Sequence, residues 1–153
     1  MNETLSNVFT LQSRLVMAGW VVLAAFPYWQ YMQSVVMIII LVICATYSYF
    51  VFFGHRYDDG ARKPSFKDFG HLAGVVKMFT NPRAALGGWL HYLAFDLLVG
   101  LIIVLDSQQH DISHWFILPI LFFSLMIGPA GLVLYFVFRA FYTGNIFDLS
   151  LAF

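Results

Sequence analysis

The stretch VVMIIILVICATYSYFVFF, residues 35–53, decides the fold of this chain. Its 19 residues carry no formal charge, and a helix needs about 20 apolar residues to cross the hydrocarbon core of a bilayer. The stretch WFILPILFFSLMIGPAGLVLYFVF, residues 115–138, meets the same requirement with 24 uncharged residues. Both stretches are therefore predicted to be membrane-spanning helices.

The composition of the whole chain also predicts a membrane protein. Of its 153 residues 61% are hydrophobic and 10% are charged, and the mean hydropathy is +0.79. A soluble domain is about half apolar and a quarter charged. A chain of this length cannot bury so much apolar surface internally, so we expect one membrane domain covering residues 1–153.

Two further segments complete the expected bundle. Residues 87–105 contain Asp96 as their single charged residue, and residues 15–31 carry Pro27 near one end. An N-terminal helix lying in the membrane interface, which would leave three spans, is the alternative for the first segment. We expect an all-α protein with four spans, arranged as two hairpins, at about 11–31, 35–53, 83–105 and 115–139.

The placement of basic residues predicts the orientation of the spans. With four spans, all eight Lys and Arg residues fall on one side, and the segments 27–34 and 106–114 on the other side contain neither. Basic loops mark the cytoplasmic side of a membrane. We therefore expect a multi-pass protein of the inner (cytoplasmic) membrane, with both ends and the loop 54–82 in the cytoplasm.

The region between the second and third spans, residues 54–86, is the only sizeable polar segment. Residues 57–60 are typical of a turn. Between residues 68 and 79 one helical stripe is apolar, which predicts a short helix on the membrane surface; its members are Phe69, Leu72, Val75, Val76 and Phe79. Asn81 is expected to cap the third span, with Pro82 in its first turn. The basic residues of the loop are expected to meet anionic headgroups of membrane lipid.

Composition and missing motifs exclude several classes of function. The net charge of zero gives no basis for nucleic-acid binding, and no glycine-rich phosphate loop is present. Cys44 is the only cysteine, which excludes an internal disulfide and multi-cysteine metal sites. The first residues do not resemble a cleaved signal peptide, and we expect no cofactor.

Asp96 is the first candidate for a functional residue because it lies near the middle of the third span. Charged groups at this depth cost several kcal/mol and usually serve a function. Gly88, Tyr92, Asp96 and Gly100 are spaced by four and share one helical stripe. The alternative is a structural role, in which Asp96 only forms a hydrogen bond to another helix.

The fourth span carries a matching stripe, formed by Ser124, Gly128, Gly131, Tyr135 and Arg139. Pro129 removes a backbone hydrogen bond and is expected to kink the helix. If the last two spans form an antiparallel hairpin, Gly128 lies near the depth of Asp96. Arg139 is then expected near Gly87 and His91. A polar pocket between the third and fourth spans would therefore open toward the cytoplasm. Tyr92, Tyr135 and Trp89 have packing or interface anchoring as their alternative role.

Asp106, His110 and His114 form a possible metal site in the outer loop. The spacing Asp-x3-His-x3-His would line one face of a helix, and carboxylate with imidazole suits zinc. The loop lies at the end of a span, however, and a solvated loop is the favoured interpretation because this spacing alone is weak evidence.

Two blocks of the sequence resemble a known family. The first runs from FTNPR at 79–83 through GWLHYLAFDL at 88–97 to Gly100 and Asp106, and the second has GPAGL at 128–132 with Tyr135 and Arg139. They resemble the abscisic-acid-deficient-four-like family, whose plant members are chloroplast membrane proteins needed to make neoxanthin from violaxanthin. The first residues do not resemble a plastid transit peptide, so we expect a bacterial-type member.

The resemblance implies a link to carotenoid or isoprenoid metabolism. The reaction of the plant members opens an epoxide and forms an allene without net redox. Such a reaction requires an acid at the epoxide oxygen and a base that removes a proton from the polyene. Our hypothesis is that protonated Asp96 is the acid and His91 the base, with Tyr92 as a third catalytic candidate. The candidates for substrate binding are Trp89, Gly88, Gly100, Gly128, Pro129, Tyr135 and Arg139.

Three functions therefore remain open. The first is an isomerase for a lipophilic polyene, or an accessory protein that binds or presents one. The second is a small proton-coupled transporter, which with four spans would need a homodimer. The third is a non-catalytic assembly subunit whose glycine-rich faces pack against a membrane protein partner.

Overall fold

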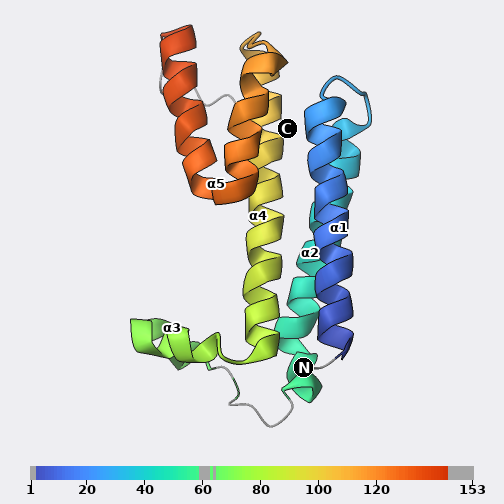
Figure 1. The fold of residues 1–153 in the computed structure, drawn as a ribbon, viewed down its shortest axis with the longest axis vertical. Helices are drawn as coiled ribbons and strands as arrows, with labels where there is room; N and C mark the ends of the chain where they lie inside the picture. Colours follow the sequence, from blue (N-terminus) through green and yellow to red (C-terminus); the bar gives the residue numbers. More distant parts are fainter. Residues whose placement is uncertain (1–2, 59–62, 64, 145–153) are drawn as a thin grey trace. The chain divides into compact units, whose positions relative to one another are not determined.

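The computed structural model describes residues 3–58, 63 and 65–144, and all regular secondary structure in the described part is helical (Figure 1). Four helices are long and apolar enough to cross a membrane, as predicted: α1 (Glu3–Ala25), α2 (Met32–Phe52), α4 (Pro82–Gln109) and α5 (His114–Thr143). Three short elements lie between α2 and α4: the 3-10 helices η1 (Gly54–Tyr57) and η2 (Phe66–Gly70), and α3 (Leu72–Met78).

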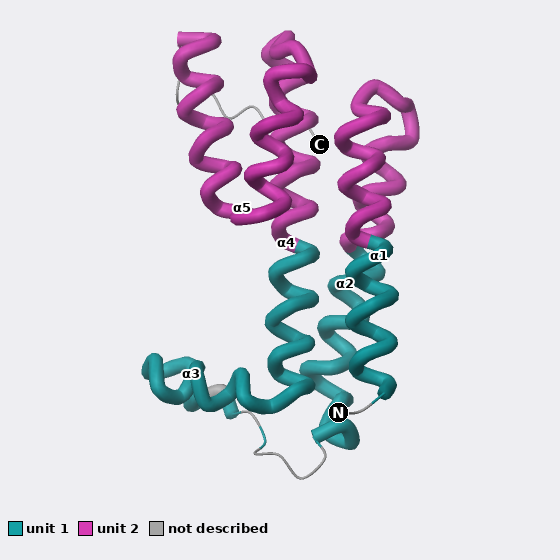
Figure 2. The backbone as a smooth tube through the Cα atoms, in the orientation of Figure 1, with its two compact units in different colours: residues 1–15, 41–94 teal, residues 16–40, 95–153 magenta. Residues whose placement is uncertain are grey.

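The chain divides into two compact units, shown in different colours in Figure 2. Unit 1 contains residues 1–15 and 41–94, and unit 2 contains residues 16–40 and 95–153. The helices α1, α2 and α4 each contribute residues to both units, whereas α5 belongs to unit 2 alone.

The ends of two long helices differ from their predicted positions. The first span was expected at about 11–31, but α1 begins at Glu3 and ends at Ala25, ahead of Pro27. A proline ring disfavours helical backbone at the residue before it, here Phe26, and this accounts for the earlier end of α1. The third span was expected to end at residue 105, but α4 continues to Gln109.

The extension of α4 corrects the interpretation of residues 106–114 as a solvated loop. Asp106 and Ser107 are buried within the helix. The chain leaves α4 through Asp111, whose φ of 52° lies in the left-handed region, and the Ile112 amide donates to the Ser107 carbonyl at 2.9 Å. Left-handed residues with such backward hydrogen bonds commonly terminate helices.

The segment between η1 and α4 forms two short helical pieces in place of the single helix expected over residues 68–79. His71 separates them because its backbone is extended, with φ −157° and ψ 147°. The turn expected at residues 57–60 lies partly outside the described residues. The predicted cap of α4 is confirmed: the Asn81 side chain accepts hydrogen bonds from the amides of Arg83 and Ala84, at 2.9 and 3.1 Å, and Pro82 is the first helical residue.

The helix α5 reverses direction near its middle, which is a larger change than the predicted kink. Ile127, two residues before Pro129, has non-helical backbone angles, φ −142° and ψ 50°. A Cβ atom on Gly131 would overlap the backbone of Ser124, although residues 124 and 131 of a straight helix lie about 10 Å apart. In Figure 1 the orange first half and the red second half of α5 accordingly lie side by side.

Aromatic packing confirms that the two ends of α5 are neighbours. The rings of Phe116 and Phe138, one from each half, lie 5.8 Å apart between centroids. The second hairpin was expected to contain a kinked α5, but α5 instead reverses and ends beside its own beginning.

Candidate functional site

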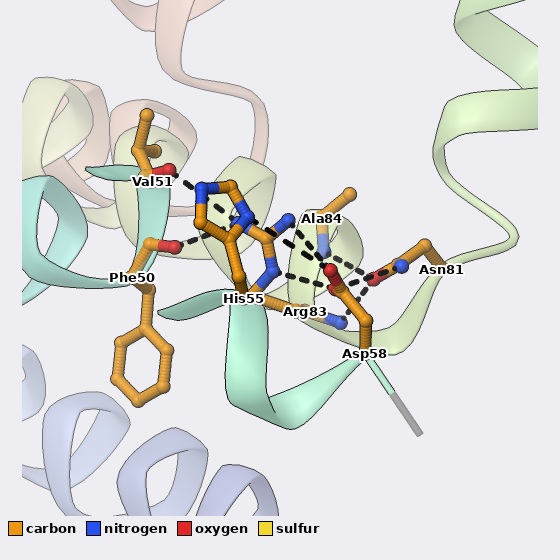
Figure 3. Close-up of polar contacts among 7 residues, drawn as sticks. All are labelled: Phe50, Val51, His55, Asp58, Asn81, Arg83 and Ala84. Atoms are coloured by element: carbon orange, nitrogen blue, oxygen red, sulfur yellow. Dashed lines mark hydrogen bonds and ion pairs between the residues drawn. The ribbon is translucent and has the colours of Figure 1, made fainter. Parts of the chain in front are cut away.

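A buried ion-pair cluster joins three elements of unit 1 (Figure 3). Arg83 donates to Asp58 through Nε at 2.7 Å and through Nη2 at 3.3 Å, and its Nη1 donates to the Phe50 carbonyl at 2.8 Å. Asn81 donates to the same Asp58 carboxylate at 3.0 Å. Arg83, Asp58 and Asn81 are all buried. The cluster therefore fixes the end of α2 and the end of η1 against the beginning of α4.

The pKa of Asp58 is set by opposing effects. Burial acts most strongly and raises the pKa, because it penalises the charged form. The hydrogen bonds from Arg83 and Asn81, together with the positive charge of Arg83, outweigh this effect. The pKa of Asp58 is therefore lowered, and the carboxylate remains charged at neutral pH.

Acid is expected to destabilise unit 1 through Asp58. Because its folded-state pKa lies below the usual value of 3.8, the carboxylate stabilises the fold above that value, and this stabilisation is lost as the pH falls through the folded-state pKa. The Tm in detergent should therefore fall below about pH 4. The Asp58→Asn variant should have a lower Tm at neutral pH and a smaller fall in acid. An equal fall in both proteins would contradict this role.

A cavity of about 460 Å³ lies beside the cluster, and all its lining residues belong to unit 1. Its walls come from α2, α4 and the segment between them, and most of its lining is aromatic or apolar. The lining includes Tyr47, Phe69, Phe79, Gly87, Gly88 and His91. Such a volume and lining are typical of a site for a small apolar ligand.

Two of the residues proposed from the sequence line this cavity, namely His91 and Gly88. The His91 ring lies 5.8 Å from the Tyr47 ring between centroids. Gly88 lies directly against Phe79, because a Cβ atom on Gly88 would overlap that ring. Gly87 differs from Gly88, since the nearest atom to a Cβ there is 4.0 Å away on Tyr47.

Asp96 lies in unit 2 and is not among the residues that line the cavity. It is buried, and Gly128 packs directly on its carboxyl group, because a Cβ atom on Gly128 would overlap it. Gly128 therefore lies at the depth of Asp96, as expected. The structure does not place Asp96 in the site that His91 lines.

Trp89 and Tyr92 form an aromatic pair on α4, away from the cavity lining. Their rings stack at 5.6 Å, and Trp89 also donates to the Ser13 hydroxyl at 3.2 Å. Gly100, a third candidate for substrate binding, instead permits close helix packing in unit 2. A Cβ there would lie 2.7 Å from the Trp20 ring.

A second buried cluster lies in unit 2, between the end of α4 and the second half of α5. The Tyr135 hydroxyl donates to Asp106, and Arg139 Nε lies 3.4 Å from the same carboxylate. Arg139 Nη2 also donates to His110 Nε2 at 2.9 Å. A guanidinium only donates, so Nε2 is the accepting nitrogen and the proton of a neutral His110 is on Nδ1, facing the Asp106 carbonyl.

This cluster corrects the expected position of Arg139. Arg139 was expected near Gly87 and His91, on the assumption that the last two spans form an antiparallel hairpin along their whole length. It lies instead beside Asp106, near the end of α4 and 19 residues after Gly87 in the chain. Tyr135 shares this position, whereas Pro129 is exposed at the reversal of α5.

The structure brings together only two of the three residues in the metal site considered from the sequence, Asp106, His110 and His114. His110 lies 3.7 Å from Asp106, between Nδ1 and Oδ2, but His114 Nε2 is 3.0 Å from the Ala24 carbonyl. In the part of the chain that the structure describes, no group of three His, Cys, Asp or Glu residues could hold a metal ion.

Sequence reasoning missed the roles of Arg83, Asp58 and Tyr47. Arg83 was counted as a basic residue of the cytoplasmic side and as part of the family block at 79–83, and Asp58 only as part of a turn. The position of Arg83, directly after the Asn81-Pro82 cap, could have predicted an acidic partner. A charge in the first turn of a spanning helix needs such a partner.

Comparison with known proteins agrees with the sequence blocks. Residues 7–135 match the model of a family described as ABA DEFICIENT 4-like. No curated protein and no solved structure matches the chain.

Proposed function

The chain belongs to the ABA DEFICIENT 4-like family, and from this premise we propose that it is an integral membrane protein of carotenoid or isoprenoid metabolism. In this proposal the protein binds and presents a lipophilic polyene, with one end group of the ligand in the cavity of unit 1. The basic loop faces the cytoplasm of a bacterial inner membrane, as the positive-inside rule predicts.

The observation that carries the proposal is the cavity formed by the family block. Gly88 and His91 come from the sequence GWLHYLAFDL, and both line the cavity together with the rings of Tyr47 and Phe79. Aromatic faces and apolar side chains suit a conjugated ligand. The cavity of about 460 Å³ is large enough for a ring end group, while the remaining polyene would extend outside it.

Binding and presentation are favoured over acid–base isomerisation. An isomerase of the type expected for this family needs an acid and a base within hydrogen-bond reach of the reacting atoms. His91 lines the cavity but Asp96 does not, so the hypothetical pair is not assembled there. His91 and Tyr47 instead supply polar contacts for an oxygen atom of the ligand.

Filling the cavity is expected to remove bound pigment. Gly87→Leu projects a side chain into the open space in front of Tyr47, where the nearest atom is 4.0 Å from the new Cβ. The variant should fold normally, because nothing in its backbone surroundings must move. When the protein is purified from a polyene-producing host, the ratio of pigment to protein in its absorption spectrum should fall at least about tenfold, which corresponds to 1.4 kcal/mol.

The matched control adds the same side chain elsewhere in unit 1. Gly70 has no atom within 4 Å of a Cβ position and does not line the cavity, so Gly70→Leu should retain its pigment. Absence of any polyene from the wild-type protein would refute the proposal. Equal pigment in the wild type and Gly87→Leu would place the ligand outside this cavity.

A further inference from the structure

The exposed charges between α2 and α4 are all positive in the part of this segment that the structure describes. The exposed charged side chains among these residues are Arg56, Lys63, Lys67 and Lys77. The two described acids, Asp58 and Asp68, are both buried. The described surface of this segment therefore presents cations without exposed acids between them, unlike an ordinary soluble loop.

Both acids are occupied within the protein. Asp58 is paired with Arg83. The Asp68 carboxylate accepts a hydrogen bond at 2.9 Å from the Ser65 amide at the beginning of η2. Among the described residues of this segment, burial of these two carboxylates leaves only basic side chains as exposed charges.

Large apolar side chains lie exposed beside the lysines. Phe69, Leu72 and Val76 are 62%, 79% and 61% exposed. In α3, Gly74 and Met78 are buried, so Leu72 and Val76 occupy the opposite face. Water is an unfavourable environment for such a face, and a combination of exposed apolar and basic residues is typical of segments that lie in a membrane interface.

The direction of α3 agrees with an interfacial position. Within unit 1, α3 lies crosswise to the first half of α4 (Figure 1). Because α4 is long and apolar enough to cross a membrane, a short helix crosswise to its beginning runs along the bilayer surface.

We propose that residues 65–79 bind anionic phospholipid headgroups at the bilayer surface. Lys67 and Lys77 contact the headgroup phosphates, while Phe69, Leu72 and Val76 enter the boundary of the acyl chains. This binding does not depend on the occupant of the cavity. Phe69 and Phe79 also line the cavity, so the segment that binds lipid forms part of the cavity wall.

The proposal is tested with a fluorescent probe on the exposed face of α3. The environment-sensitive dye NBD is attached to the full chain at Val76→Cys, in a Cys44→Ala background that leaves a single thiol. The protein is placed in nanodiscs of phosphatidylcholine, with or without phosphatidylglycerol. Anionic lipid should shift the emission to the blue and reduce quenching by iodide. Inorganic phosphate added to phosphatidylcholine nanodiscs should have no such effect.

Charge variants separate headgroup binding from simple proximity to the membrane. Lys67→Gln and Lys77→Gln should each weaken the preference for anionic lipid about fivefold, and the Lys→Arg variants should retain it. A probe that responds equally in both lipid compositions would overturn the proposal, as would Lys→Gln variants that behave like the wild type. Folding of each variant is checked by its Tm.

Discussion

Arg139→Met is expected to cost about 3–5 kcal/mol of folding free energy, because removing one partner of a buried ion pair leaves the other charge uncompensated. Asp106 and Arg139 are both fully buried. Without the guanidinium, the Asp106 carboxylate keeps the hydrogen bond from Tyr135 and the more distant His110 Nδ1 at 3.7 Å, and neither replaces the full positive charge of Arg139. The loss is measured as a lower Tm and a smaller monodisperse fraction in detergent.

Two further variants identify the cause of that loss. Arg14→Met removes an exposed arginine and should change the Tm little, because exposed charges contribute little to stability. The double variant Asp106→Asn with Arg139→Met removes both charges and should recover part of the lost Tm. A double variant less stable than Arg139→Met would argue against the ion pair.

Gly131→Ala is expected to destabilise the protein by about 1–3 kcal/mol, the usual cost of forcing extra volume into a packed site. The new Cβ would overlap backbone atoms of Ser124, which cannot rotate away. If α5 were one straight helix, the two residues would lie two turns apart. The same substitution would then stabilise the helix by about 1 kcal/mol. The sign of the change in Tm therefore reports whether α5 reverses.

Gly87→Ala is the matched control for Gly131→Ala. It is the same substitution inside a long helix, but its Cβ meets no atom closer than 4.0 Å. Its Tm should remain equal to that of the wild type or rise. A stabilising Gly131→Ala, equal in effect to Gly87→Ala, would rule out the reversal.

The sequence predicted those parts of the fold that depend on local chemistry. Four apolar helices follow from hydropathy, because the length of an apolar run directly reflects the thickness of the bilayer. The beginning of α4 follows from Asn81 and Pro82, because one supplies a side-chain acceptor and the other lacks an amide proton.

The reversal of α5 could not be predicted by the same reasoning. Hydropathy reports that a segment prefers lipid, and a run of 30 residues satisfies this as one span or as two half-length helices. Pro129 indicates a break but does not fix its angle. Arg139 was misplaced for that reason alone, since its position depends on the direction of the second half of α5.

In the candidate site, too, the sequence predicted residues that are close together in the chain but not their partners on other helices. His91 and Gly88 were found because they stand in one continuous block on α4. The partners that complete the cavity and its border are distant in the chain: Asp58 precedes Arg83 by 25 residues, and Tyr47 comes from a different helix. No spacing rule connects residues on separate helices, so only the three-dimensional structure could bring them together.

The pairing of Asp106 with Arg139 has a consequence for how the protein is made. Arg139 follows Asp106 by 33 residues, so at about 5–20 residues per second the carboxylate waits about two to seven seconds for its counter-ion to be translated. During that interval the end of α4 carries a carboxylate without the arginine that pairs with it in the folded protein. We therefore expect water to solvate Asp106 until the last part of α5 has been synthesised, so that this pairing is a late step of folding.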